Sequence, residues 1–150
     1  MHVERLTELI QYQHLERIRI ARPFFLRSIE PAPSEFRNGE ALSARRLGER
    51  IVIEFRENRF AMIHLMIAGR LRWRKLRAAL PRGAGLAAFD FSSGTMLVTE
   101  ASSQRRASLH LVESSAALST FDRGGLEVLH ASYAQFRRSF NTKTTPSSAI

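Results

Sequence analysis

The stretch Arg45–Trp73, RRLGERIVIEFRENRFAMIHLMIAGRLRW, combines a strand-turn-strand pattern with a concentration of positive charge. Two apolar runs, Arg50–Arg56 and Arg59–Ile67, flank the dipeptide Glu57-Asn58. Each run has the length of a strand, and a two-residue link between them is typical of a β-hairpin, although the usual glycine is missing. Because both runs are densely apolar, we predict that they are central strands of a sheet.

The residues after this hairpin alternate between arginine and apolar side chains. Gly69 allows a bend, and in Arg70–Arg74 the side chains of Leu71 and Trp73 fall on one side of a strand and three arginines on the other. From residue 45 to residue 82 there are 11 Lys or Arg against 3 Asp or Glu, so this quarter of the chain carries +8 of the formal net charge of +9. A strand with one basic face is a candidate surface for phosphate groups.

The rest of the chain predicts further short strands and few helices. Val3–Tyr12 has apolar residues at helical spacing, whereas from Leu15 onward the apolar residues recur at every second position. One helical turn is predicted at Ser115–Leu118 and a helix at Ala131–Phe140. Many short strands at this spacing predict a mainly β fold with short helices (α+β), arranged as a two-sheet β-sandwich. The further strands are predicted over Phe24–Ile29, Leu86–Phe91, Thr95–Thr99 and Ala107–Val112.

Composition limits the class of protein and its partners. A chain of 150 residues with 44% hydrophobic residues predicts one globular domain. Because there is no cysteine and the five histidines are not closely paired, we expect no metal and no cofactor. There is no apolar run of about 18 residues and no secretory signal, which predicts a cytoplasmic protein without a membrane span. The pI near 11.4 favours a nucleic-acid partner, with an arginine-rich but merely solvated surface as the alternative.

Seven motifs follow one another along most of the chain. They are LERIRI at 15–20, RRLGER at 45–50, IHLMIAGRLRW at 63–73, GLAAFDF at 85–91, SGTMLVTEA at 93–101, RRASLHL at 105–111 and GGLEVL at 124–129. In this order they resemble the amino-terminal domain of the formamidopyrimidine-DNA glycosylase and endonuclease VIII family, over about residues 6–140. The resemblance implies a two-sheet β-sandwich that lines one side of a DNA cleft. The family excises oxidised bases and cleaves the resulting abasic site through the amine of an amino-terminal proline.

The resemblance also implies which residues face DNA. His64 matches the histidine of the family's HL motif and would donate a hydrogen bond near a phosphate. Arg105 would reach into the duplex from a later loop. Together with the basic residues of the opening stretch, these positions make up the predicted DNA-binding set: Arg45, Arg46, His64, Arg70, Arg72, Arg74, Arg105 and Arg106.

Three departures separate the chain from the family's catalytic pattern. The sequence begins with MHVE rather than with Met-Pro-Glu, so we expect a truncated start, no amine nucleophile and no catalytic residue. Glu49 stands where the family has a phosphate-binding lysine, and a carboxylate there repels phosphate. Ala107 stands where the family has an aromatic wedge, which puts recognition of damaged bases in doubt.

The sequence therefore predicts one glycosylase-like domain over residues 1–140, a disordered tail over 141–150, and no helix-two-turn-helix or zinc-finger domain. Three hypotheses for its function remain open. The chain is a truncated or catalytically inactive DNA glycosylase and abasic-site lyase of base excision repair that keeps a DNA-facing surface. Alternatively, it is a non-enzymatic module that binds nucleic acid without specificity, or an interaction domain that forms a homodimer through the surface that the missing half would cover.

Overall fold

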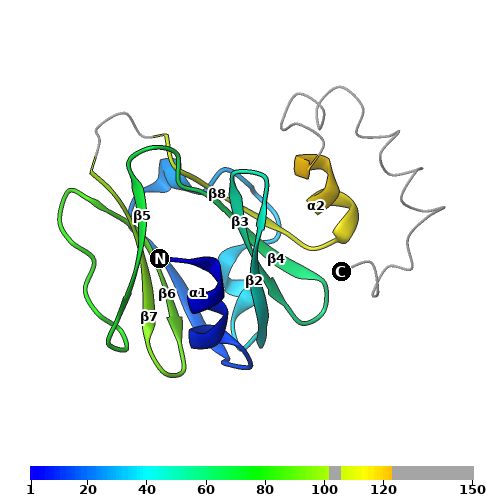
Figure 1. Ribbon diagram of the computed structural model, residues 1–150, viewed down its shortest axis with the longest axis horizontal. Helices are drawn as coiled ribbons and strands as arrows, with labels where there is room; N and C mark the ends of the chain where they lie inside the picture. Colours follow the sequence, from blue (N-terminus) through cyan, green and yellow to red (C-terminus); the bar gives the residue numbers. More distant parts are fainter. Residues whose placement is uncertain (102–105, 123–150) are drawn as a thin grey trace.

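Two four-stranded antiparallel sheets pack face to face in the computed structural model, which describes residues 1–101 and 106–122 (Figure 1). The first sheet has the strand order β1-β6-β7-β5 and the second has the order β2-β3-β4-β8. This arrangement confirms the predicted mainly β sandwich. The strands are β1 (Leu15–Ile20), β2 (Ala41–Leu47), β3 (Arg50–Phe55), β4 (Arg59–His64), β5 (Gly69–Arg74), β6 (Gly85–Phe91), β7 (Thr95–Glu100) and β8 (Ser108–Val112).

The hairpin predicted around Glu57-Asn58 is confirmed as β3 and β4, the two central strands of the second sheet. Phe55 pairs with Arg59, so the link has three residues, Arg56, Glu57 and Asn58, rather than the predicted two, and Glu57 and Asn58 have positive φ angles of 68° and 60°. The strand β4 ends at His64 rather than at Ile67, because the chain turns at once into β5. Gly69 is required in this turn, since a Cβ there would overlap the backbone of Leu65.

The core lies between the sheets and under the helix α1 (Val3–Ile10). The α1 helix buries Leu6 and Ile10 against the edge of the second sheet, and Tyr12 ends the helical region with a φ of 66°. A row of aromatic rings crosses from one sheet to the other. Centroids lie 6.4 Å apart for Phe55 and Phe91, and 6.2 Å apart for Phe91 and Trp73. Stacked and tilted rings at these distances stabilise the contact between the sheets beyond their buried area.

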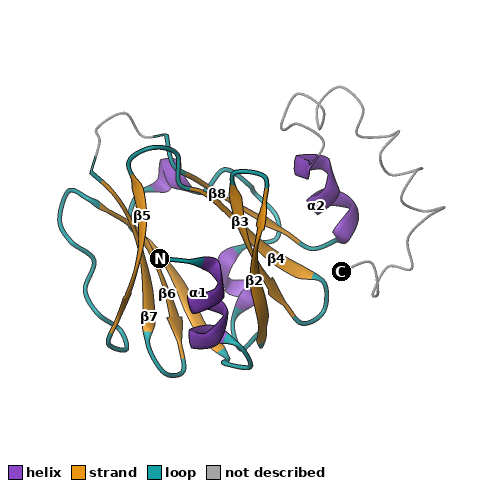
Figure 2. Cartoon of the chain, in the orientation of Figure 1, coloured by secondary structure: helices purple, strands orange, loops and turns teal. Residues whose placement is uncertain are grey.

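Each sheet also has a covered outer face. The helix α2 (Ser115–Asp122) follows β8 (Figure 2), and its Leu118 packs against an apolar patch of the second sheet that includes Met62 and Val112. Across the first sheet runs the connection between β5 and β6, residues 75–84. The backbone N–H of Arg77 in this connection donates to the hydroxyl oxygen of Thr95 at 2.7 Å.

The buried Asp90 fixes this outer face of the first sheet. Arg19 donates to both carboxylate oxygens of Asp90 at 2.9 Å, and the hydroxyl of Thr95 donates to it at 2.6 Å. Arg19 also donates to the carbonyl oxygen of Ala78 at 2.7 Å, which ties the connection to the sheet. Burial raises the pKa of Asp90, but the hydrogen bonds from Arg19 and Thr95 outweigh burial, so the pKa is lowered overall.

The prediction of a strand at Phe24–Ile29 is wrong. Two 3-10 turns, Pro23–Phe25 and Pro33–Phe36, occupy this region instead, and only Leu26 makes a single bridge to Leu109. Pro23 lacks a backbone N–H and has a fixed φ, so it begins a turn that buries Phe25 instead of continuing a ladder. The α2 helix is longer than the predicted turn at 115–118, and the predicted helix at 131–140 and tail at 141–150 lie outside the described residues.

Candidate nucleic-acid interface

Three connections meet at one end of the sandwich, the upper end in Figure 1. They are the β2–β3 turn, the β4–β5 turn and the return of the chain into β8. The strand register brings them together, because Arg50 pairs with His64, His64 pairs with Ser108, and Gly69 pairs with Glu100. Here we call this end of the sandwich the turn end. It contains four of the predicted DNA-binding residues: Arg46, His64, Arg70 and Arg106.

His64 lies at the centre of the turn end and contacts Glu49. Its Nε2 is 3.5 Å from Glu49 Oε1, and the side chains are 18% and 89% exposed. Burial is the largest effect on the pKa of His64 and lowers it, the charge of Arg50 lowers it further, and Glu49 only partly opposes them. The imidazole is therefore neutral at neutral pH and can donate one hydrogen bond. The carboxylate of Glu49 lies beside Nε2, where a phosphate oxygen would otherwise accept the hydrogen bond of the imidazole.

Arg46 lies beside the amino-terminal end of α1. A cavity of about 550 Å³ opens between the first turn of this helix and β2, and Glu4 and Arg46 are among the residues that line it. The hydroxyl of Thr7 fixes the helix to the strand, donating to the carbonyl oxygen of Ala44 at 2.8 Å and accepting from its N–H at 3.0 Å. The helix terminus carries partial positive charge, so it adds to the attraction of Arg46 for anions.

Arg70 and Arg106 are held at the turn end by backbone contacts. Arg70 donates to the carbonyl oxygens of Ile67 and Gly69 at 2.8 and 2.7 Å, which folds its side chain over the β4–β5 turn. The carboxylate of Glu100, only 4% exposed, accepts from the backbone N–H groups of Arg106 and Ala107, both at 3.0 Å. Sequence analysis missed Glu100, although an acidic residue between an apolar strand and a polar loop was a usable signal.

Among the described residues, three others of the predicted set, Arg45, Arg72 and Arg74, are not brought to this end. Arg45 points onto the outer face of the second sheet, where its Nη1 lies 3.0 Å from Glu54 Oε1. Arg72 and Arg74 are exposed, as the predicted alternation requires, but they follow β5 away from the turn end. Arg105 lies outside the described residues. Of the seven predicted residues that the structure describes, the turn end therefore holds four.

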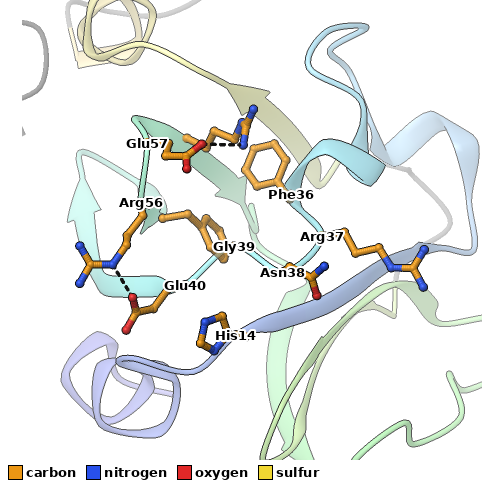
Figure 3. Close-up of a pocket in the computed structure, with 10 residues that line it drawn as sticks. His14, Phe36, Arg37, Asn38, Gly39, Glu40, Arg56 and Glu57 are labelled. Carbon is orange, nitrogen blue, oxygen red and sulfur yellow. Dashed lines mark hydrogen bonds and ion pairs between the residues drawn. The ribbon is translucent and has the colours of Figure 1, made fainter.

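A second cavity, of about 330 Å³, lies at the opposite end of the sandwich beside the β3–β4 turn (Figure 3). Four of the charged side chains that line this cavity form two ion pairs with one another. Arg56 hydrogen-bonds to Glu40, and Arg59 lies 3.6 Å from Glu57. In Figure 3 the guanidinium group of Arg37 points away from these pairs. The cavity therefore offers no set of converging groups to a ligand.

Two other features are absent from the described part of the chain. No three His, Asp or Glu side chains lie together there as a metal site would require. No helix over these residues has the length and apolar character needed to cross a membrane.

No family model and no curated protein matches the sequence. Solved structures of Lactococcus lactis formamidopyrimidine-DNA glycosylase do match the fold, each with 17% sequence identity and a TM-score of 0.71. One of these is a complex with DNA that contains a formamidopyrimidine lesion, and another is bound non-covalently to DNA with an abasic site. The match covers 81% of this chain and 45% and 46% of those two chains, so this chain spans about half of the glycosylase. The described residues have the fold of the amino-terminal domain of formamidopyrimidine-DNA glycosylase.

Proposed function

We propose that this chain binds the backbone of duplex DNA through the turn end, in a role related to DNA repair. The observation that carries the proposal is the meeting of Arg46, His64, Arg70 and Arg106 at one end of the sandwich. Among the described residues, no carboxylate lies within ion-pair distance of the three arginines. Cations that are not neutralised locally are available to replace the counterions of a duplex. The shared fold supports this proposal, because the similar structures are complexes with DNA.

We further propose that the chain binds DNA without excising a base or cleaving an abasic site. Proton transfer to a flipped nucleotide needs a carboxyl group that is free to face it. Glu100 is buried and already accepts two backbone hydrogen bonds, and Glu49 contacts His64. Glu4 is exposed in the first turn of α1. The buried Glu100 is thus not free for acid-base chemistry, and the exposed Glu49 faces the imidazole of His64.

Binding is tested with labelled duplexes that are intact, contain an oxidised purine, or contain an abasic site. We expect similar affinities for the three and a steep loss of affinity with salt. Arg46→Gln and Arg106→Gln should each reduce the steepness of the slope of log affinity against log salt concentration by about 0.9, which is the contribution of one phosphate contact. Arg37→Gln, an exposed arginine at the opposite end, is the matched control and should leave the slope unchanged.

Catalysis is tested on the same abasic duplex by reduction with borohydride. A covalent adduct or a nicked strand would contradict the proposal that the chain is inactive. If no duplex binds at low salt and the mass of the protein rises with its concentration, the DNA-binding proposal fails and the hypothesis of a dimerising interaction domain is favoured.

A further inference from the structure

The strand β5 is an edge of the first sheet, with β7 on one side and no strand of the described residues on the other (Figure 1). Two other edges of the sandwich are covered. The helix α1 and the residues after it bond to β2, and residues 26–28 bond to β8. Within residues 1–101 and 106–122, the only backbone bond on the open side of β5 runs from the N–H of Gly69 to the carbonyl oxygen of Leu65, at 2.9 Å. This bond closes the β4–β5 turn and leaves the rest of the edge open.

The register shows which backbone groups of β5 face the open side. In an antiparallel ladder, successive residues direct their N–H and C=O alternately to one side and to the other. Glu100 donates its N–H to the carbonyl oxygen of Ala84 at 2.8 Å, so its backbone faces β6 and not its β5 partner, Gly69. Counted in steps of two from Gly69, Leu71 and Trp73 also direct their N–H and C=O away from β7. The arginines between them bond to β7 instead.

Three backbone groups on the open side have no partner among the described residues. They are the N–H and C=O of Leu71 and the N–H of Trp73. Arginine side chains cover two further groups, because Arg70 donates to the carbonyl oxygen of Gly69 at 2.7 Å and Arg74 donates to that of Trp73 at 2.9 Å. The edge therefore offers two donors and one acceptor to another strand, and it holds two more acceptors under guanidinium groups.

The side chains of β5 define which strand fits this edge. Arg70, Arg72 and Arg74 are exposed on the outer face, and no carboxylate of the described residues lies within ion-pair distance of them. Residues directly opposite on neighbouring strands point to the same face, so every second side chain of an added strand meets an arginine. Carboxylates are favoured at these positions. The side chains between them lie beside Leu71 and Trp73, where apolar residues fit.

Two other occupants fit less well. A second copy of this chain that paired β5 with β5 would place arginines opposite arginines, and like charges directly opposite each other destabilise a sheet. The phosphate backbone of a duplex accepts hydrogen bonds but donates none, so it leaves the C=O of Leu71 without a partner. An extended peptide supplies both donors and acceptors at the spacing of the strand.

We infer that the open edge of β5 binds an extended acidic peptide as an added antiparallel strand, with carboxylates at alternate positions opposite Arg70, Arg72 and Arg74. The carboxylates draw Arg70 and Arg74 away from the carbonyl oxygens of Gly69 and Trp73, which frees both oxygens for hydrogen bonds. The inference goes beyond the proposed DNA binding and does not rest on it, although Arg70 belongs to both surfaces.

The probe is the acetylated peptide Glu-Val-Glu-Val-Glu, whose residues match Arg70–Arg74 one to one. Amide hydrogen exchange of the full chain is followed by NMR with and without saturating peptide. The peptide should slow exchange at Leu71 and Trp73 by about tenfold or more, because their N–H groups become bonded. Exchange at Arg72 should change little, because this N–H already bonds to β7. Unchanged exchange at Leu71 and Trp73 would overturn the inference.

Two matched peptides separate an added strand from simple attraction of charge. Glu-Glu-Glu-Val-Val has the same charge without the alternation. The alternating peptide with N-methyl groups on both valines keeps the charge and the side chains, but it cannot donate to Leu71 or Trp73. Each should bind about tenfold or more weakly, the value of about two backbone hydrogen bonds. If either binds as tightly as the unmodified peptide, charge alone explains the contact and no strand is added.

Charge reversal tests the position of the site. R72E/R74E should lose the Glu-Val-Glu-Val-Glu peptide and bind Lys-Val-Lys-Val-Lys, a gain of binding that requires a folded β5. R37E/R82E changes the charge equally at exposed arginines outside β5 and should still prefer the acidic peptide. If R72E/R74E does not change its preference, or if R37E/R82E changes it as well, the site is not at β5.

A labelled duplex separates this inference from the proposed function. The turn-end variant R46Q/R106Q should bind the duplex more weakly and the peptide as the wild type does. If the peptide protects Leu71 and Trp73 but R46Q/R106Q binds the duplex like the wild type, the added strand stands and the turn end fails as a DNA interface. If the duplex slows exchange at these two residues and the peptide does not, the edge belongs to the DNA interface and the inference is overturned.

Discussion

Replacing Glu49 by lysine should strengthen the binding of DNA. Glu49 lies beside His64 at the turn end, and its carboxylate repels any phosphate that approaches the imidazole Nε2. Lysine at this position turns that repulsion into attraction. Glutamine removes the repulsion without adding attraction. The series from Glu to Gln to Lys therefore separates the two effects.

The size of the effect follows from the exposure of the group. The Glu49 side chain is 89% exposed, so the dielectric constant of water applies to it. A phosphate oxygen that accepts from His64 Nε2 would lie where Glu49 Oε1 now lies, 3.5 Å from that nitrogen. The displaced carboxylate would remain within about 4 Å of the phosphate oxygen, and two charges at this separation in water interact by about 1 kcal/mol. We expect Glu49→Gln to tighten binding about fivefold at low salt and Glu49→Lys about thirtyfold. The lysine variant should also add about 0.9 to the salt slope.

The assay is fluorescence anisotropy of a labelled intact duplex at several salt concentrations. Glu57→Lys is the control, because Glu57 is also in a hairpin turn and 79% exposed, but lies at the opposite end of the sandwich. It changes the net charge by the same amount. If Glu57→Lys tightens binding as much as Glu49→Lys does, only the net charge matters and the turn end is not the interface. An unchanged affinity in Glu49→Lys would refute the reasoning directly.

Three further predictions concern stability. Asp90→Ala leaves Arg19 partly buried without its partner, so urea unfolding should show a loss of about 3 kcal/mol or more. Burial, followed by the charge of Arg50, lowers the pKa of His110 to about 4 from its usual 6.5. Between these two pH values the unfolded chain binds a proton that the folded chain excludes, so stability should fall by up to about 3 kcal/mol on acidification, and less in His110→Gln. Gly94→Ala places a Cβ against the ring of Trp73 and should lower stability by about 1–3 kcal/mol, with a shift in the fluorescence of this sole tryptophan.

Most of the sheet structure could be predicted because local patterns agree with the tertiary structure. The run Arg70–Arg74 alternates in sequence, and in the fold Leu71 is buried while Arg70 and Arg72 are exposed. The hairpin at Glu57-Asn58 was recognisable from two apolar runs with a short link between them, although the register shows a link of three residues rather than two. The prediction of a strand at Phe24–Ile29 failed because the apolar residues there belong to a buried turn and not to a β-ladder. Apolar content alone does not distinguish a buried turn from a strand.

The candidate site was harder to predict, because it depends on which residues of different strands become neighbours. Sequence analysis placed Glu49 and His64 near one phosphate only through the family resemblance, and their direct contact follows from the pairing of Arg50 with His64. It also grouped Arg70, Arg72 and Arg74 in one surface. These three side chains are exposed at alternate positions of β5, as the predicted basic face requires, and the strand carries them progressively away from the turn end.

The position of the acidic residues decides how basic the surface is. Asp90 and Glu100 are buried in the first sheet, and each holds a segment that displays cations: Asp90 holds the connection 75–84 through Arg19, and Glu100 holds the backbone at Arg106. Glu100 uses backbone N–H groups for this purpose, so it neutralises no surface arginine by direct pairing. The buried carboxylates still count in the formal charge of +9, but they leave the exposed arginines at these segments without an acidic neighbour on the surface. Glu49 is the exposed exception at the turn end, and for that reason its substitution is the most direct test of where DNA binds.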